Sequence, residues 1–323
     1  MAKILVTGGA GYIGSHAACM LTQNQHEVVV LDNLESGKKE AVLNAELLVL
    51  DLANKEALDK CFAHHSFDAI MHFASFIQVG ESVEKPAKYY RNNLQNTLNL
   101  LHIALKYNVK KFIFSSSAAV YGEPQYTPID VNHPKNPLNP YGRSKLMVEQ
   151  ILADYDKAYD FRSVNLRYFN AAGADPLARI GESHNPETHL IPLVLQAASK
   201  RSPDVKIFGT DYPTPDGTCI RDYIHVVDLC AAHLLALEVL LKGGQSAVYN
   251  LGNGKGFSVL ELIKTAEKVT QCHIPVVNFE RRAGDPAVLV ADSLLAQKEL
   301  GWKPKFADLE TIIKHAWQWE KKQ

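Results

Sequence analysis

The sequence has no excess of positive charge and no long apolar run, and each absence excludes a class of protein. Its 34 lysines and arginines are balanced by 35 aspartates and glutamates among 323 residues, so the charge does not favour nucleic acid. No run approaches the roughly 18 apolar residues of a membrane span. No signal peptide precedes the first predicted strand, which begins at Ile4. We therefore expect a cytoplasmic globular protein with no nucleic-acid or membrane partner.

Cysteine is scarce and scattered. The five cysteines form no C-x-x-C pair and their number is odd, which argues against a disulfide framework and suits a reducing compartment. The 13 histidines are more numerous, but His64-His65 and the pair His184 and His189 lack ligand spacing with acids or cysteines. We therefore expect these to be loop and surface histidines, and we expect no metal site.

Apolar runs of strand length alternate with helical stretches through the first half of the sequence. The predicted strands are rich in β-branched or aromatic residues and cover 4–7, 28–32, 47–50, 69–73, 111–115 and 163–169. Predicted helices, with apolar residues at helical spacing, include 13–23, 94–107 and 146–159. This alternation predicts an α/β fold with a Rossmann-type doubly wound parallel sheet and helices on both faces.

The character of the sequence changes after Asn170, where loops lengthen and become richer in proline, glycine and aspartate. Helical patterns remain at 190–199, 227–241, 259–270 and 309–319. We expect residues 1–170 to form a dinucleotide-binding domain and residues 171–323 a smaller, interleaved α/β lobe that binds the substrate. The segment at about 221–241 is expected to pack back against the first domain.

A glycine-rich turn follows the first predicted strand and opens the first predicted helix. Gly8, Gly11 and Gly14 have G-x-x-G-x-x-G spacing in the strand–turn–helix context of a dinucleotide site, where glycine lets backbone N–H groups approach phosphate. The second predicted strand ends at Asp32, where an acid binds ribose hydroxyls. Because Asp32 repels a 2′-phosphate and no arginine lies in the turn, the helix or the second strand, we expect NAD rather than NADP.

Two further strand ends give weaker signals for the same cofactor. Asp51 and Leu52 follow the third predicted strand, where an adenine contact is expected. Phe73 ends the fourth and is followed by Ala74 and Ser75, where small residues let the backbone pass close to the cofactor. Ligands of parallel sheets bind at the carboxyl ends of the strands, so both segments are expected beside the dinucleotide.

A tyrosine and a lysine four residues apart supply the chemistry. Tyr141 and Lys145 share one helix face after a helix-start signal at 137–140, and Ser117 follows a strand end that brings its hydroxyl alongside. A phenol with a pKa of about 10 is a poor base at neutral pH. A nearby ammonium and a cationic nicotinamide favour phenolate, so we expect them to lower the pKa of Tyr141 toward neutrality. These three residues are the predicted catalytic set of a nicotinamide-dependent enzyme acting on a carbinol.

Taken together, these motifs resemble the extended short-chain dehydrogenase/reductase family, and most closely its UDP-glucose 4-epimerases. The matching segments cover nearly the whole length, at 6–16, 31–34, 79–82, 114–122, 141–150, 166–170, 211–218, 221–226, 281–285 and 300–302. The resemblance implies an NAD-dependent isomerase of galactose metabolism that inverts C4 of a UDP-hexose by transient oxidation with tightly bound NAD. It also implies a homodimer that packs through the helices at 94–107 and 146–159.

The resemblance also assigns residues to each ligand. Those that line NAD, besides the glycines and Asp32, are Tyr12, Ile13, Asn33, Asp51, Leu52, Phe73, Ala74, Asn93, Tyr141, Lys145 and Phe169. Those that bind the UDP-sugar are Ser117, Tyr141, Asn170, His189, Leu190, Phe208, Arg221, Arg282 and Asp285. Guanidinium groups suit the diphosphate, but the sequence does not decide whether Arg282 or its neighbour Arg281 faces the ligand.

Three residues depart from the pattern of the family. Ile77 replaces a lysine that touches the cofactor, and His189 replaces an asparagine at the sugar diphosphate. Leu289 stands where a side chain decides whether an N-acetyl group fits at C2 of the sugar. Epimerisation of UDP-GlcNAc and UDP-GalNAc, or of another UDP-sugar, therefore remains an alternative.

Other classes of function fit the sequence less well. A nucleotide-sugar 4,6-dehydratase carries Asp-Glu after the strand-end hydroxyl, where this chain has Ala118 and Ala119. A net dehydrogenase or reductase would need an exchangeable cofactor. A non-catalytic NAD-binding protein is disfavoured because the catalytic set is complete.

Overall fold

The computed structural model describes residues 1–282 and 284–323, and its largest element is a seven-stranded sheet. The strand order is β10–β6–β5–β4–β1–β2–β3, and neighbouring strands are parallel throughout. The strands are β1 (Lys3–Thr7), β2 (Glu27–Asp32), β3 (Glu46–Val49), β4 (Ala69–His72), β5 (Lys111–Ser115), β6 (Arg162–Tyr168) and β10 (Ala247–Leu251). The predicted Rossmann-type parallel sheet is confirmed, with β10 as an additional strand. Ala283, part of the 281–285 segment, lies outside the described residues.

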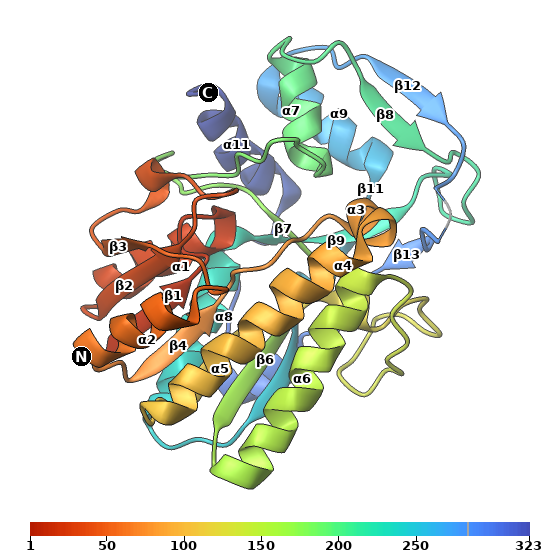
Figure 1. The fold of residues 1–323 in the computed structure, drawn as a ribbon. Helices are drawn as coiled ribbons and strands as arrows, with labels where there is room; N and C mark the ends of the chain where they lie inside the picture. The colour runs from red at the N-terminus through yellow and green to blue at the C-terminus, as the bar shows by residue number, and fades with distance from the viewer. Residues whose placement is uncertain (283) are drawn as a thin grey trace.

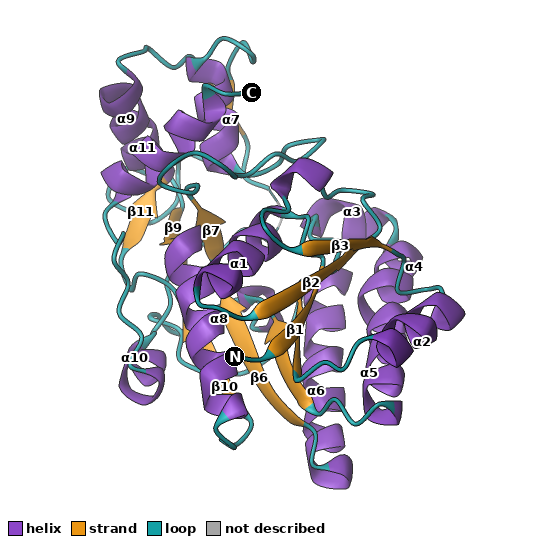
Figure 2. Cartoon of the chain, turned by 90° about the vertical axis from the view of Figure 1, so that its left-hand side faces the viewer, coloured by secondary structure: helices purple, strands orange, loops and turns teal. Residues whose placement is uncertain are grey.

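Helices cover both faces of this sheet, because successive side chains of a strand point to opposite sides. Along β1, Ile4 and Val6 face one buried core and Leu5 faces the other. The first face carries α1 (Tyr12–Gln23), α8 (Val226–Leu241) and α10 (Leu294–Leu300), and the second carries α2 (Lys55–His64), α5 (Asn96–Lys106) and α6 (Pro140–Tyr159). Figure 1 shows α2, α5 and α6 in front of the sheet, and Figure 2 shows them on the side opposite α1 and α8.

A smaller part of the molecule lies beyond the carboxyl ends of these strands (Figure 1, top). Its strands are β7 (Asn170–Ala172), β8 (Val205–Phe208), β9 (Ile220–His225), β11 (Gly256–Ser258), β12 (Val276–Phe279) and β13 (Val288–Leu289). Strand β9 pairs with β7, β11 and β13, and β8 pairs with β12. Its helices α7 (Leu190–Ala198), α9 (Val259–Thr270) and α11 (Leu309–Glu320) enclose a separate apolar core.

The chain crosses between the two parts more than once. It enters the smaller part at β7, returns through α8 and β10, leaves again through β11 and α9, and comes back at α10. The fully buried Trp302, which follows α10, holds this segment against α8, because its Nε1 donates to the backbone carbonyl of Asp228 at 2.9 Å. The segment expected at about 221–241 to pack back is only partly as predicted, since Ile220–His225 form β9 of the smaller part and the return runs from Val226 to Leu251.

Two helices differ from their predicted bounds. The helix predicted at 94–107 is preceded by α3 (Val79–Glu84), α4 (Pro86–Tyr89) and a π-helical segment, Tyr90–Gln95. Helix α6 begins at Pro140 rather than at 146, because the Asn139 side chain caps it by accepting from Gly142 N at 2.9 Å. This earlier start places Tyr141 and Lys145 on one helix. Among the described residues, no helix is long and apolar enough to cross a membrane.

Candidate active site

The glycine-rich turn forms a tight seat at the carboxyl end of β1. Gly8 has a φ of +71°, and a Cβ on it would lie 2.5 Å from Ala74 N. A Cβ on Gly14 would lie 2.2 Å from Gly8 O. Helix α1 begins after Gly11 without a side-chain cap and without an acidic residue in its first turn. The first N–H groups, at Tyr12 and Ile13, are therefore open to a phosphate, so the turn fits a dinucleotide pyrophosphate.

Three polar residues meet at the ends of β2 and β3. The buried Asp32 carboxylate accepts from Ala10 N and from Leu34 N, each at 2.9 Å. Asn33 Nδ2 donates to Asp51 Oδ2 at 2.8 Å. The carboxylates retain further lone pairs for hydroxyl donors, which suits the adenosine end of a dinucleotide. Leu52, beside them, is buried in the core below.

Asn93 fixes the loop that follows β4. Its Oδ1 accepts from Phe76 N at 2.9 Å, and its Nδ2 donates to Phe76 O at 3.0 Å and to Ser144 Oγ at 3.3 Å. The loop itself presents Ala74 to the glycine-rich turn, while Phe73 packs against His233 with ring centroids 4.9 Å apart. The amide of Asn93 is thus engaged by the protein, and it shapes the loop beside the predicted cofactor.

The predicted catalytic residues come together between β5 and α6. Lys145 Nζ lies 5.8 Å from the ring centroid of Tyr141, and the two residues are 3% and 8% exposed. The ammonium donates to Ser75 Oγ at 2.9 Å and to Ser115 O at 2.8 Å. Ser117 caps a short turn, its Oγ accepting from Ala119 N at 3.1 Å. The fixed position of Lys145 leaves one of its three N–H donors for another partner.

The pKa of Tyr141 differs from the expectation. Burial raises the pKa of Tyr141, and the Ser117 hydroxyl lowers it only in part. Burial also lowers the pKa of Lys145 to about 7, against a smaller raising effect of Glu149. A half-charged lysine is a weak source of positive potential, so the protein alone does not supply the phenolate. Within the chain itself desolvation outweighs the Ser117 hydrogen bond, and the ammonium does not lower the pKa of Tyr141 as expected; the lowering expected from a nicotinamide stays a prediction.

Sequence reasoning missed the side chains that support this set. Ser75 was noted only for its backbone, although its hydroxyl holds Lys145 from 70 positions away. Tyr168 shares a 2.5 Å hydrogen bond with Ser115 Oγ. Below them, Glu149 of α6 and Arg167 of β6 form a buried bidentate pair. The position of Ser75 at a strand end could have indicated its contact with Lys145. No feature of the sequence indicates that Glu149 and Arg167 pair.

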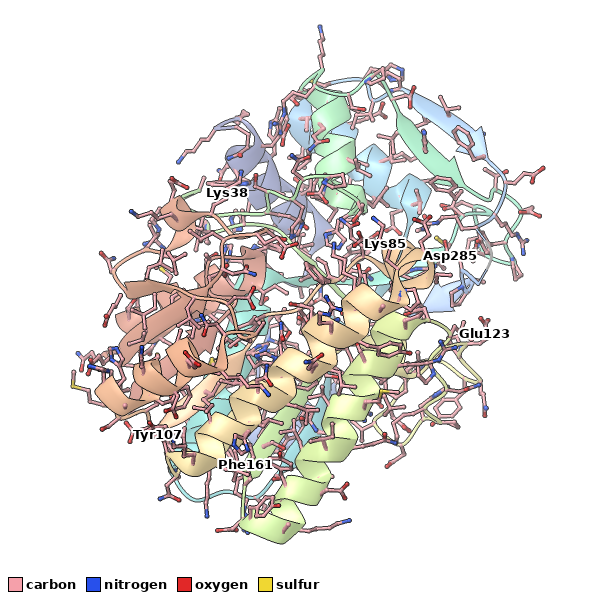
Figure 3. The ribbon with its side chains drawn as sticks, viewed as in Figure 1. Lys38, Lys85, Tyr107, Glu123, Phe161 and Asp285 are labelled. Atoms are coloured by element: carbon pink, nitrogen blue, oxygen red, sulfur yellow. The ribbon has the colours of Figure 1, made fainter. Side chains whose placement is uncertain are left out.

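A second group of predicted residues gathers at the edge of the smaller part. Arg282 Nε donates to Asp285 Oδ2 at 2.9 Å, and its guanidinium lies 4.8 Å from the ring centroid of Phe208. Arg221 of β9 approaches Asp285 Oδ1 at 3.6 Å. Figure 3 labels Asp285 near the border between the two parts. Arg281 instead pairs with Asp211 at 2.7 Å, so Arg282 is the one that faces this group.

The remaining predicted substrate residues are less closely grouped. Asn170 Nδ2 donates to Asp222 O at 2.8 Å, linking β7 to β9. His189 precedes Leu190, the first residue of α7. Leu289 of β13 and Phe169 both pack against the buried cluster of Val120, Tyr121 and Ile129.

His184 and His189 lie in a loop as expected, and His189 is exposed, but the expectation that they lack acidic residues at ligand spacing is wrong. The chain folds back so that both approach Glu182 and Glu187. Burial would lower the pKa of His184, but these carboxylates raise it to about 10, and the histidines help to lower the pKa of Glu182 to about 2 against its burial. The spacing E-x-H-x-x-E-x-H was visible in the sequence and was overlooked.

Comparison with known proteins agrees with this geometry. The profile of the NAD dependent epimerase/dehydratase family matches residues 4–252. A UDP-glucose 4-epimerase of Halalkalibacterium halodurans is 52% identical over 318 residues, which cover 98% of this chain and 95% of that protein. A crystal structure of a UDP-glucose 4-epimerase superposes with a TM-score of 0.98 at 50% identity, covering 99% of this chain and 98% of the other.

The cofactor also appears in this comparison. A UDP-glucose 4-epimerase from Brucella ovis, solved in complex with NAD, superposes with a TM-score of 0.96 at 46% identity over 98% of both chains. Likeness at this level extends over both parts of the molecule and includes the glycine-rich turn and the Tyr141–Lys145 helix. On these grounds the chain is a member of the NAD dependent epimerase/dehydratase family.

Proposed function

We propose that this protein is an isomerase that inverts C4 of a UDP-hexose and interconverts UDP-glucose and UDP-galactose. The observation that carries this proposal is the placement of Tyr141, Lys145 and Ser117 beside the dinucleotide seat, in a chain about half identical over its length to UDP-glucose 4-epimerases. Because the product regains the hydride that the substrate gave up, the reaction needs no second redox partner. This places the protein in galactose and nucleotide-sugar metabolism.

Tyr141 is the proton acceptor for the sugar 4-hydroxyl, and Ser117 holds the same oxygen. Bound NAD would accept the hydride from C4 of the sugar, and its positive charge would favour phenolate at Tyr141. Ser75 and Ser115 position Lys145, and its remaining N–H donor would be available to a hydroxyl of the cofactor. The proton returns from Tyr141 when C4 is reduced on its other face. Lys145 and Tyr141 are buried, so water is kept from the open redox step.

The nucleotide is held by the group at the edge of the smaller part. Arg221 and Arg282 bind the diphosphate, and Asp285 binds the uridine ribose. Asp285 lies between the two guanidinium groups, at 2.9 Å from Arg282 Nη2 and 3.6 Å from Arg221 Nη2. The carboxylate preorients both arginines and offers an acceptor for a ribose hydroxyl. Firm contacts with the nucleotide and loose contacts with the sugar would allow the 4-keto sugar to rotate, so that its opposite face is reduced.

We also propose a homodimer that packs through α5 and α6, in a reducing, cytoplasmic compartment. Leu98 on α5 and Met147 on α6 are apolar and more than one third exposed. Helices α5 and α6 lie side by side on the front of the molecule in Figure 1. All five cysteines are free. Two apolar side chains on adjacent helices suit a four-helix contact between two copies.

The proposed activity is tested with purified protein and no added NAD. UDP-galactose, UDP-GalNAc, UDP-arabinose and UDP-galacturonate are incubated separately, and C4 inversion is followed by proton NMR. We expect UDP-galactose to equilibrate with UDP-glucose, with protein-bound NAD visible by absorbance. Inversion of UDP-GalNAc as well would show that Leu289 admits an N-acetyl group. Unchanged spectra for all four sugars would defeat the proposal.

A further inference from the structure

Four side chains in the loop before α7 bring their donor atoms to one point. His184 Nδ1 lies 3.2 Å from Glu182 Oε1 and 3.7 Å from Glu187 Oε2. His189 Nδ1 lies 3.8 Å from Glu187 Oε1 and contacts Glu182 Oε1. All four donor atoms lie within 4.8 Å of one another. Ligand atoms about 2.1 Å from a tetrahedral Zn²⁺ are roughly 3.4 Å apart. Three of the distances are close to that spacing, and the contact between His189 and Glu182 must open for both to bind an ion.

The polar atoms of the quartet are not satisfied by hydrogen bonds alone. His184 Nδ1 is buried and has no hydrogen-bond partner among the described residues, although Glu182 Oε1 is close by. Glu187 is held in place from behind, since its Oε1 accepts from Thr188 N at 2.7 Å and from His189 N at 2.9 Å. Such fixed carboxylates are typical of metal sites, where surrounding hydrogen bonds orient the ligands.

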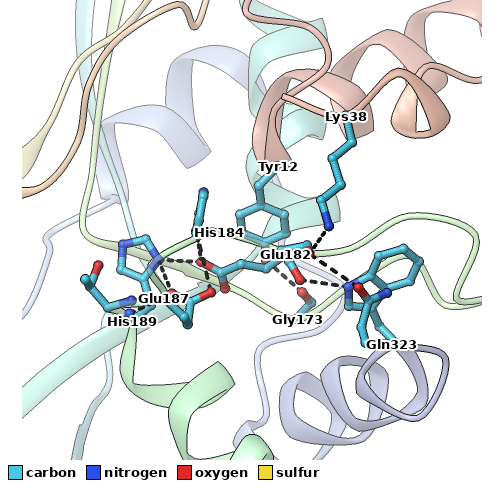
Figure 4. Close-up of polar contacts among 11 residues, drawn as sticks. Tyr12, Lys38, Gly173, Glu182, His184, Glu187, His189 and Gln323 are labelled. Carbon is cyan, nitrogen blue, oxygen red and sulfur yellow. Dashed lines mark hydrogen bonds and ion pairs between the residues drawn. The ribbon is translucent and has the colours of Figure 1, made fainter. Parts of the chain in front are cut away.

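The quartet lies where three elements meet (Figure 4). The Tyr12 ring of α1 stands edge-on to His184, with ring centroids 6.4 Å apart. Trp319 Nε1 of α11 donates to Glu182 O at 2.8 Å, and His189 is the residue that precedes α7. The glutamate side chains are 6% and 5% exposed, whereas His189 is 45% exposed and leaves a route for an ion. An ion held here would join α1, α7 and α11.

We propose that Glu182, His184, Glu187 and His189 form a structural site for one divalent transition-metal ion, with Zn²⁺ as the expected occupant. Two imidazole nitrogens and two carboxylate oxygens form a donor set that zinc accepts, and the two negative charges balance the ion. Mg²⁺ and Ca²⁺ prefer sites made of oxygen alone. Four protein ligands leave no open position, so the ion stabilises the loop and takes no part in the redox step. Because His189 is also predicted to bind the UDP-sugar, the site and the proposed substrate share this one residue, and the experiment that tests the site measures metal binding alone.

The site is tested by metal binding rather than by turnover. The protein with its bound NAD is treated with EDTA, and Zn²⁺ is added without any UDP-sugar, in a calorimetric titration and in a thermal-shift series. His184→Gln and Glu187→Gln remove one ligand each. His273→Gln is the matched control, because His273 pairs with Glu267 at 2.9 Å on the exposed surface, away from the quartet. Circular dichroism and NAD content verify that each variant folds.

We expect one Zn²⁺ per chain in the wild type and in His273→Gln, with a rise in Tm on addition. Affinity should fall by at least about 100-fold in the ligand variants, with the rise in Tm lost. X-ray absorption at the zinc edge of the wild-type protein, which does not depend on any variant, should show two imidazole nitrogens among four light ligands. No zinc binding by the wild type, equal binding by the ligand variants, or a zinc shell without imidazole would each overturn the proposal.

Discussion

Lys145 is a buried ammonium held by two acceptors, and its environment limits what Tyr141 does without a cofactor. Ser75 Oγ and Ser115 O occupy two of its donors, yet burial lowers its pKa to about 7. Burial likewise raises the pKa of Tyr141. At neutral pH Tyr141 is therefore neutral and Lys145 only partly charged. A cationic nicotinamide beside Tyr141 would favour phenolate, so we expect cofactor binding to promote formation of the base.

Replacing the phenol tests its role directly. Tyr141→Phe should lower kcat by about 10²- to 10⁴-fold, the usual contribution of a positioned acid–base group, with NAD still bound. Tyr107→Phe is the matched control, because Tyr107 also stands four residues before a lysine, Lys111, but lies at the end of α5 with that lysine on β5. The measurement is a coupled assay with UDP-galactose. A Tyr141→Phe variant within a few fold of the wild type would contradict the assignment.

Lys145 also makes stability depend on pH. Its pKa is about 7 in the folded protein and 10.5 ordinarily, so between these values the unfolded chain binds a proton that the folded chain does not. The stability of the wild type should therefore rise with pH from about 7 to 10 through this group. Lys145→Met removes the effect, so its Tm should exceed that of the wild type most at pH 7, by a margin that shrinks toward pH 10. Calorimetry at matched NAD content decides this, and a margin that does not change with pH would argue against it.

At the scale of elements, the turn between β1 and α1 separates structural from ligand-facing glycines. A Cβ at Gly14 would lie 2.2 Å from Gly8 O, whereas a Cβ at Gly11 would meet only Gly8 O at 3.4 Å. At Gly14 the backbone of the turn leaves no room for a Cβ. At Gly11 there is room within the protein, and that space is where we expect a phosphate. Two alanine substitutions should therefore fail in different ways.

Gly14→Ala should lower Tm by several degrees, because α1 must move away from the turn. Gly11→Ala should keep a Tm near that of the wild type and lose NAD, since its methyl group occupies space meant for the phosphate. Scanning calorimetry and the NAD content after gel filtration measure the two effects. Full NAD content in Gly11→Ala would show that the pyrophosphate lies elsewhere.

Local periodicity explains which elements the sequence revealed. The strands from β1 to β6 are apolar runs that alternate with helices, and Tyr141 and Lys145 share a face because of their spacing alone. Strand β10 escaped prediction because it lies outside the strand–helix alternation of the first half and pairs with β6, more than 80 residues earlier. The contacts of Lys145 with Ser75 depend on tertiary packing between such distant segments. The pKa of Tyr141 was missed for a related reason, since burial is a property of the whole fold.

At the scale of the whole molecule, the exposed apolar residues of α5 and α6 suggest how two copies associate. Leu98→Glu and Met147→Glu, each on one of these helices, should convert a dimer to a monomer by burying a charge in the contact. Leu177→Glu is the control, because Leu177 is 70% exposed and lies on neither helix. Light scattering after gel filtration gives the mass. A monomeric wild type, or dimers in all variants, would refute the interface.

The central claim is that one carbon of the sugar loses and regains the same hydride within one molecule. UDP-galactose carrying deuterium at C4 is incubated with the purified protein, without added NAD, and the UDP-glucose formed is examined by NMR and mass spectrometry. The account predicts full retention of deuterium at C4 of the product. Loss of the label to solvent, or transfer to a second molecule, would contradict it.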